Sequence, residues 1–277
     1  MNSLDETYGR RAAPPGSARY FSWLFAGTPA RAPLLGTFAL LAEWRAAMHG
    51  GSDPVVAAAK IEWWREEMRR LALARPVHPI CRYLAALPGA AAVDWRPLED
   101  AAAAAAACVA GAPVERDADL SDFADDLIGK PLRTAARLAA PVTDTVELRA
   151  CTRALASAEY IVRAIEDQPR AAQFGRILFP VRELLDHGIG NDDLCAAAPG
   201  AALGAYLERA RAQAARHFAQ AALALPAPQR PANRGLLVLA ALGAHHLRAG
   251  RPPGAPGVAV RDLFLAWRTA RRASRTH

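Results

Sequence analysis

Apolar residues recur along much of this chain at intervals of three and four, which is the period of an amphipathic helix. The clearest stripe consists of Leu155, Ala158, Ile161, Val162 and Ile165. Comparable stripes predict helices over residues 31–43, 60–71, 203–225, 236–247 and 260–272. No segment shows the sustained alternation with β-branched residues that predicts a strand. The pattern therefore predicts an all-α fold of about ten helices.

The pattern also predicts the limits of a single domain over residues 17–272. Residues 1–16 end in Ala-Ala-Pro-Pro-Gly, which indicates a disordered lead-in. A short aromatic helix that contains Tyr20 follows. Residues 98–109 are almost pure alanine, and because alanine is the best helix former, we interpret them as a core helix.

Two features near the carboxyl end concern side-chain direction. In the helix predicted over 260–272, Leu263, Phe264 and Trp267 are expected to pack, while Arg268, Arg271 and Arg272 remain in solvent. The basic tail could touch a membrane surface, but a solvated terminus is the simpler explanation. His245 and His246 are adjacent and point to different faces of a helix, so they are not expected to bind one metal together.

The chain carries a formal charge of +7, almost wholly from arginine, since only Lys60 and Lys130 are lysines. A basic surface suits diphosphates, acidic lipid headgroups or nucleic acid. The arginines are dispersed over the predicted helices and accompany no nucleic-acid-binding motif, so we expect no nucleic-acid partner.

Segment lengths and cysteine spacing bear on localisation. The two longest apolar runs, 101–110 and 235–244, are about half as long as a bilayer span, so no transmembrane helix is predicted. The first residues include acids and no apolar stretch, which argues against a secretory signal. The four cysteines are far apart and indicate neither a disulfide framework nor a zinc site. We therefore predict a cytoplasmic protein, with peripheral contact at the inner membrane as an alternative.

Asp122, Asp125 and Asp126 form the most conspicuous acidic string. A metal site is one interpretation. The simpler one makes Ser121 an N-cap with acids in the first helical turn, where the helix dipole favours negative charge. Pro131, shortly after, is expected to kink this helix.

The helix with the clearest stripe carries charge on its other flank. Glu159 and Glu166 each precede an arginine by four residues, which is typical of a solvated helix face. Pro169 is expected to end or kink the helix. Gly175 marks a turn before a short apolar run that contains Pro180.

This order of parts resembles the second signature of the squalene and phytoene synthase family, in which a D-x-x-x-D motif ends a helix and Gly-Arg, an apolar run and proline follow. The matching positions here are Asp167 to Ala171, Gly175-Arg176 and Pro180. Paired carboxylates on one helix face hold Mg²⁺, which neutralises the diphosphate of a prenyl substrate. Only one of the pair, Asp167, remains.

An earlier segment resembles the first signature of the same family. The aspartates of that signature fall here on Arg45 and His49. Residues 39–44 place Glu43 as in a branch whose helix reads A-F-N-x-E-L, and residues 60–65 are similar to its R-L-Q-W-W-R string. That branch includes proteins related to assembly factors of respiratory complex I, which also lack the paired aspartates.

The resemblance implies an isoprenoid synthase fold, with helices around a central cavity. It implies Asp167 as the catalytic and metal-binding residue, and Mg²⁺ as the cofactor of an active enzyme. The substrate-binding positions that it implies are Tyr20, Arg31, Glu43, Gly129 and Arg176. The implied partners are a prenyl diphosphate or another isoprenoid or lipid, the inner membrane and a respiratory complex.

Three hypotheses about function follow. The first is a degenerate family member that retains an isoprenoid- or lipid-binding cavity and acts as an accessory protein. The second is an active prenyltransferase that condenses two prenyl diphosphates with an unusual metal shell. The third is a structural helical scaffold, for which the alanine-rich core and the dispersed charge suffice.

Overall fold

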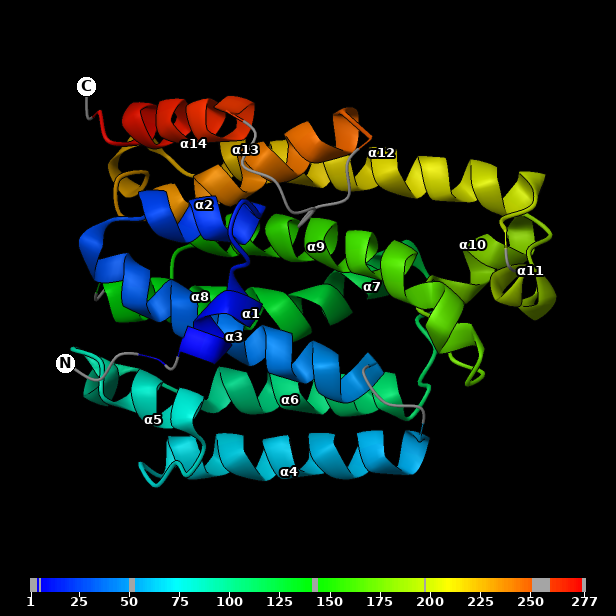
Figure 1. The fold of residues 1–277 in the computed structure, drawn as a ribbon, viewed down its shortest axis with the longest axis horizontal. Coiled ribbons are helices and arrows are strands. Elements are labelled where there is room, and N and C mark those ends of the chain that lie inside the picture. Colours follow the sequence, from blue (N-terminus) through cyan, green and yellow to red (C-terminus); the bar gives the residue numbers. More distant parts are fainter. Residues whose placement is uncertain are drawn as a thin grey trace.

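The structure is a computed structural model that describes residues 4, 6–49, 53–140, 144–196, 198–250 and 260–275. In the described residues every regular element is a helix, as the periodicity predicts (Figure 1). The α-helices are α1 Glu6–Ala12, α2 Ala18–Phe25, α3 Thr28–His49, α4 Pro54–Ala72, α5 Pro79–Ala85, α6 Arg96–Val109, α7 Asp117–Ala124, α8 Lys130–Ala139, α9 Val146–Ala172, α10 Val181–Asp186, α11 Asn191–Cys195, α12 Ala201–Ala224, α13 Arg234–Arg248 and α14 Val260–Ala273. Short helices such as α1, α5, α10 and α11 take the number beyond the predicted ten.

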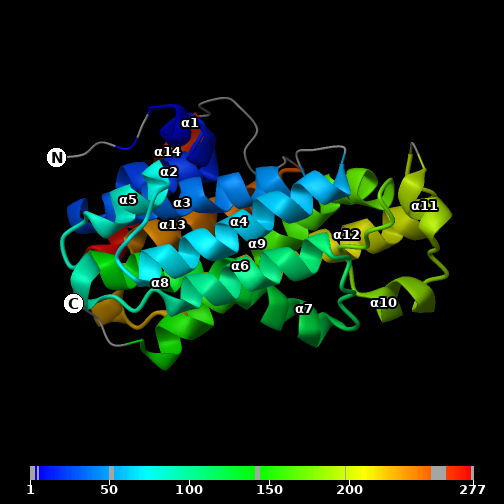
Figure 2. The same ribbon diagram turned by 90° about the horizontal axis from the view of Figure 1, so that it is seen from below.

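Helix α9 runs through the middle of the molecule, with α12 and α13 on one side and α8, α3, α6 and α4 on the other (Figures 1 and 2). Its predicted apolar stripe is confirmed, because Leu155 and Ala158 are fully buried and Ile161 is nearly so. The helix continues through Pro169 to Ala172, three residues beyond the position where the proline was expected to act. Other elements are therefore placed relative to α9.

Caps fix where several helices begin. The Ser17 hydroxyl accepts a hydrogen bond from the Tyr20 amide at 3.1 Å, and Asp53 accepts one from Val55 at 2.8 Å. His78 caps α5 through Nδ1, and its ring lies 4.5 Å from that of Trp64. His78 thus has a structural role at a helix start.

The predicted disordered lead-in is wrong for part of its length, because residues 6–12 form α1, which packs against α3. Ala12 is fully buried, and Arg11 bonds Glu43 of α3 at 3.2 Å. Two small alanines and an ion pair supply the packing, and alanines before a Pro-Pro-Gly sequence are a weak signal for it.

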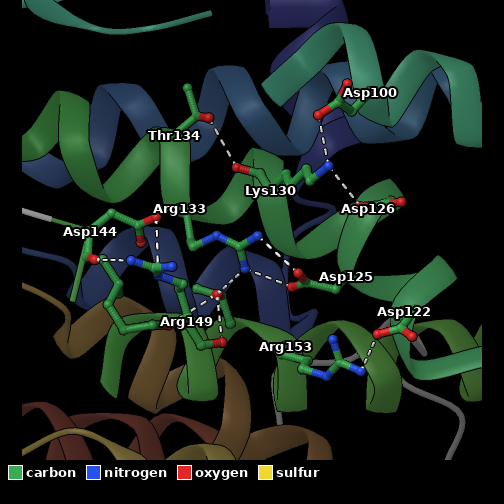
Figure 3. A network of polar contacts seen from close by, with 12 residues as sticks. Asp100, Asp122, Asp125, Asp126, Lys130, Arg133, Thr134, Asp144, Arg149 and Arg153 are labelled. Carbon is green, nitrogen blue, oxygen red and sulfur yellow. Dashed lines mark hydrogen bonds and ion pairs between the residues drawn. The ribbon is translucent and has the colours of Figure 1, made fainter. Parts of the chain in front are cut away.

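The interpretation of the acidic string is also corrected. Ser121 lies inside α7, whose N-cap residue is Arg116, and Asp119 in the first turn accepts a hydrogen bond from the Arg116 amide at 3.0 Å. Each acid of the string faces a basic side chain (Figure 3). The pairs are Asp122 with Arg153, Asp125 with Arg133 at 2.6 Å and Asp126 with Lys130 at 2.8 Å.

A π-helical turn over Asp125–Gly129 joins α7 to α8. Pro131 follows it in the first turn of α8, where a missing amide proton costs least. A side-chain carbon on Gly129 would collide with the Asp125 carboxylate, so glycine allows the buried Asp125–Arg133 pair to form. The sequence predicts a kink caused by Pro131, whereas the irregular stretch that the structure shows is this π-helical turn before the proline.

Helix α14 is rotated relative to the prediction. Its alanines Ala266, Ala270 and Ala273 are buried, whereas Phe264 is 56% exposed and Trp267 is 43% exposed. In this orientation the buried carboxylate of Asp262 faces two histidines of α13. His246 Nε2 lies 3.0 Å from it, and His245 Nε2 lies 3.7 Å from it. The hydrogen bond between His246 and Asp262 therefore joins α14 to α13.

Gly243 on α13 provides a test of this packing. An added Cβ there would lie 2.6 Å from Cε1 of Phe218, which is fully buried on α12. We expect Gly243→Ala to lower the free energy of unfolding by about 1–3 kcal/mol, because the ring has no room to move. Chemical denaturation measures this change.

Gly204→Ala on α12 is the matched control, because nothing lies near its added Cβ. It should raise the free energy of unfolding by roughly 0.5–1 kcal/mol through helix propensity alone. Equal effects of the two substitutions would contradict the packing described here.

Candidate functional site

A pocket of about 730 Å³ opens between α1, α2, α3 and α9, and its volume is in the range of small-molecule sites. Its charged lining consists of Arg11, Arg19, Arg45, Arg163, Glu43, Glu159, Glu166 and Asp167. Small and apolar residues such as Ala42, Ala46 and Val162 form the rest. A second hollow of about 860 Å³ between α9, α12 and α13 shares Val162 and Glu166 with it.

The centre of the pocket is a three-residue ion cluster. Arg45 of α3 donates to both carboxylate oxygens of Asp167 on α9, at 2.9 and 2.8 Å, and to Glu166 at 2.7 Å. Burial disfavours the guanidinium charge, but the two carboxylates outweigh it and raise the pKa of Arg45. Burial raises the pKa of Glu166, although Arg45 acts in the opposite direction. A permanent cation is therefore held where the two helices meet.

A second cluster lies along the same wall. Glu159 accepts hydrogen bonds from Arg19 of α2 at 2.8 Å and from Arg163 at 3.0 Å. Arg19 also lies over the ring of Phe38, 5.2 Å from its centroid, and burial lowers the pKa of Arg19. The predicted Glu159–Arg163 pair exists, but on a half-buried pocket wall and not on a solvated face.

The charged residues of the lining balance one another. Four arginines face four carboxylates, and each arginine bonds at least one of them, since Arg11 pairs with Glu43 at 3.2 Å. An anionic ligand would have to compete with these carboxylates for the arginines. The pocket is thus neutral without any bound ion.

His49 ends α3 at the pocket. Its Nδ1 is buried without a hydrogen-bond partner. Burial lowers the pKa of His49 to about 4, so the imidazole is neutral at neutral pH. A neutral imidazole can bond a hydroxyl or carbonyl group, and His49 lines the pocket.

Of the residues that the resemblance implies, the pocket brings together Asp167 and Glu43. Arg45 and His49, which the resemblance aligns with the first aspartate pair, also line it, whereas Ala171 is fully buried and is not part of the lining. Three of the four positions that the resemblance assigns to the two signatures, Arg45, His49 and Asp167, therefore lie at the pocket.

The other implied residues lie outside this lining. Tyr20 packs against Phe21 with ring centroids 5.5 Å apart, and Arg31 is exposed and donates to the Leu24 carbonyl at 2.9 Å. Gly129 lies in the π-helical turn. Their roles as substrate contacts remain predictions.

Arg176 has a different place. It is buried and donates to the Met48 carbonyl at 2.9 Å, next to the end of α3. Gln168 accepts from the Leu178 amide at 2.7 Å and donates to the Arg176 carbonyl at 3.1 Å. These bonds tie the turn after α9 to the ends of α3 and α9, which carry the pocket.

Sequence reasoning missed Arg19 and Arg163 as pocket residues. Arg163 was assigned to a solvated face, because i,i+4 pairs occur on exposed helices too. Arg19 belongs to α2, and no local pattern indicates that a helix 140 positions away supplies its partner.

The donor set does not fit a magnesium cluster. Within the ranges that the structure describes, no three His, Cys, Asp or Glu side chains converge as metal ligands. Mg²⁺ requires oxygen ligands in near-octahedral geometry, and the oxygens of Asp167 and Glu166 that face the pocket already accept bonds from Arg45.

The buried imidazole of His49 should make the stability of the protein depend on pH. Because the folded-state pKa of His49 lies below its ordinary value, its contribution to stability is complete above about pH 6.5 and is lost as the pH falls towards 4. We expect His49→Gln to remove roughly 1–3 kcal/mol of this pH dependence. The measurement is the difference between wild type and variant in unfolding free energy from pH 7.5 to 4.5. His187→Gln, at an exposed histidine, is the control, and parallel curves for wild type and His49→Gln would contradict the prediction.

Two solved structures resemble this fold over nearly the whole chain. A dehydrosqualene synthase, solved in complex with ligand, superposes with a TM-score of 0.67 at 14% identity, covering 98% of this chain and 99% of that one. The squalene synthase HpnC from Alicyclobacillus acidocaldarius gives 0.67 at 18% identity, covering 88% and 90%. The chain therefore has the isoprenoid synthase fold that the resemblance implies.

No curated protein sequence matches this chain significantly. The family model described as squalene/phytoene synthase matches residues 13–273, which is most of the chain. With the fold and this match in agreement, the protein belongs to the squalene/phytoene synthase family.

Proposed function

We propose that this protein is a non-catalytic or weakly active family member that binds an isoprenoid or related lipid in the pocket between α1, α2, α3 and α9. The observation that carries the proposal is the bonding of Arg45 to Asp167 and Glu166. In an active synthase the corresponding carboxylates would hold Mg²⁺ against a diphosphate.

The guanidinium disfavours metal binding in two ways. It occupies the carboxylate oxygens that a cation needs, and its own positive charge repels a divalent ion a few ångströms away. Removing Arg45 from two partly buried carboxylates would leave unpaired charge, which costs several kcal/mol for fully buried groups. The cluster is therefore stable as it stands without metal.

The charge balance bears on the ligand. A prenyl diphosphate would bring several negative charges into a lining whose four arginines are already paired. An isoprenoid with an uncharged head needs no such exchange, and His49 offers a neutral imidazole to its hydroxyl or carbonyl group. We therefore favour an uncharged isoprenoid lipid as the ligand.

An accessory role at a respiratory complex is a further part of the proposal. It rests on the resemblance of residues 39–44 and 60–65 to the assembly-factor branch. These segments contact each other, since the rings of Trp44 and Trp64 lie 6.4 Å apart, and Glu43 between them bonds Arg11. The similar strings thus form one packed unit beside the pocket.

An active Mg²⁺-dependent prenyltransferase is the second candidate. It is favoured by the position of Asp167 and Glu166, two adjacent acids that reach the same pocket. Such an enzyme would have to displace Arg45 when metal and diphosphate bind.

Ligand binding separates these candidates. We expect farnesol to raise the melting temperature of the protein more than farnesyl diphosphate does, with no effect of added Mg²⁺ on either shift. We also expect no release of pyrophosphate from farnesyl diphosphate. Mg²⁺-dependent release that Asp167→Asn abolishes would establish the second candidate instead. The absence of any shift with either ligand would favour the structural scaffold.

Replacement of the internal cation gives a second test. Arg45→Asp combined with His49→Asp restores acids beside Asp167 and Glu166, and we expect millimolar Mg²⁺ to stabilise this variant by a few degrees while leaving wild type unchanged. Arg45→Gln is the matched control, because it removes the guanidinium without adding a carboxylate, and it should lower stability by about 1–3 kcal/mol. A wild-type response to Mg²⁺ as large as that of the double variant would refute the role given to Arg45.

A further inference from the structure

Helix α14 presents large apolar side chains to solvent. The exposed fractions of the side chains are 79% for Val260, 56% for Phe264, 43% for Trp267 and 39% for Leu263. These residues lie on one helix at the outer edge of the molecule, where α14 packs on α13 and α2 (Figure 1). A contiguous group of this kind on one exposed helix marks an interaction surface.

The same helix face is strongly basic. Its exposed arginines are Arg261, Arg268, Arg271 and Arg272. The one acid of α14, Asp262, is buried and bonded to His246, so no carboxylate of this helix faces solvent. Arg271 lies 5.2 Å from the Trp267 ring and Arg268 lies 6.0 Å from the Phe264 ring, so charge and aromatic surface alternate along the helix.

This face cannot turn into the core. The alanine edge of α14 already fills the contact with its neighbours, and the buried Asp262 carboxylate accepts a hydrogen bond from His246 of α13 on that side. The aromatic side chains are therefore free to contact a partner outside the described fold.

We infer that α14 is the surface by which this protein binds an anionic lipid membrane. Aromatic rings suit the headgroup level of a bilayer, and long arginine side chains reach phosphate groups above an embedded apolar edge. A negatively charged surface complements four arginines with no exposed acid among them. A second copy of the chain fits less well, because a two-fold contact would set these arginines against one another.

The inference is independent of the proposed ligand and of catalysis. Helix α2 connects the two regions, because it packs on α14 and supplies Ser17 and Arg19 to the pocket. Membrane binding at α14 would therefore place the pocket one helix away from the lipid surface.

Co-sedimentation of the full-length protein with vesicles tests the inference. We expect binding to phosphatidylcholine vesicles that contain phosphatidylglycerol, and little binding to phosphatidylcholine alone. Phe264→Ser with Trp267→Ser should lower the anionic-vesicle partition coefficient by about tenfold or more, as should Arg268→Gln with Arg271→Gln. Circular dichroism checks that each variant is folded.

Trp63→Ser on α4 is the matched control, because Trp63 is 42% exposed and Trp267 is 43% exposed. It should leave vesicle binding unchanged. The inference is overturned if wild type does not bind anionic vesicles, or if Trp63→Ser weakens binding as much as the α14 variants do. It is also overturned if sedimentation velocity shows a dimer that the Phe264 and Trp267 substitutions dissociate.

Discussion

The site depends on the ion pairs that the Arg45 guanidinium forms with Asp167 and Glu166. It joins α3 to the end of α9, the two helices whose ends form the pocket, and it satisfies both oxygens of Asp167 as well as Glu166. An arginine is always charged and has a fork geometry that matches a carboxylate, so this cation is permanent and directional. A magnesium ion would do the same electrostatic work only when bound, and it would leave coordination positions for a substrate. Arg45 attracts the carboxylates of α9 and occupies the oxygens that it bonds.

The other charged side chains of the pocket are also paired with one another. Arg45 neutralises Asp167 and Glu166. If the other arginines of the lining were unpaired, they would attract an anionic ligand. Instead, Arg19 and Arg163 converge on Glu159, and Arg11 meets Glu43. Burial strengthens the two pairs of Glu159 and makes them costly to open, whereas the exposed Arg11–Glu43 pair is weaker. The charged side chains of the pocket are therefore paired with one another, and its remaining walls are apolar.

The sequence predicts the fold class well, because helical periodicity is a local property that tertiary contacts reinforce. The stripe from Leu155 to Ile165 is buried as expected, and no strand was predicted or found in the described residues. The sequence predicts the rotation of α14 poorly, because its alanines and its aromatic residues both have helical spacing. In the structure the alanine side is buried, and Asp262 on that side bonds His246 of α13. The same limit explains α1 and Arg19, whose burial depends on α3 and α9 far along the chain. Asp167 could be found from its motif, but its pairing with Arg45, 122 positions earlier, could not.

Some positions that resemble the family signature have a structural role, and Arg176 is one of them. Its side chain bonds the Met48 carbonyl, and Gln168 of α9 bonds the backbone of Arg176 and Leu178 just after the turn. Loss of Arg176 would leave a buried carbonyl unpaired at the junction of α3 and the turn after α9, whatever the pocket binds. Gly129 is similar, because any side chain there would displace Asp125 from its buried partner Arg133. Such positions are held in place by packing and hydrogen bonding. Arg176 and Gly129 therefore each have a structural role whatever the pocket binds.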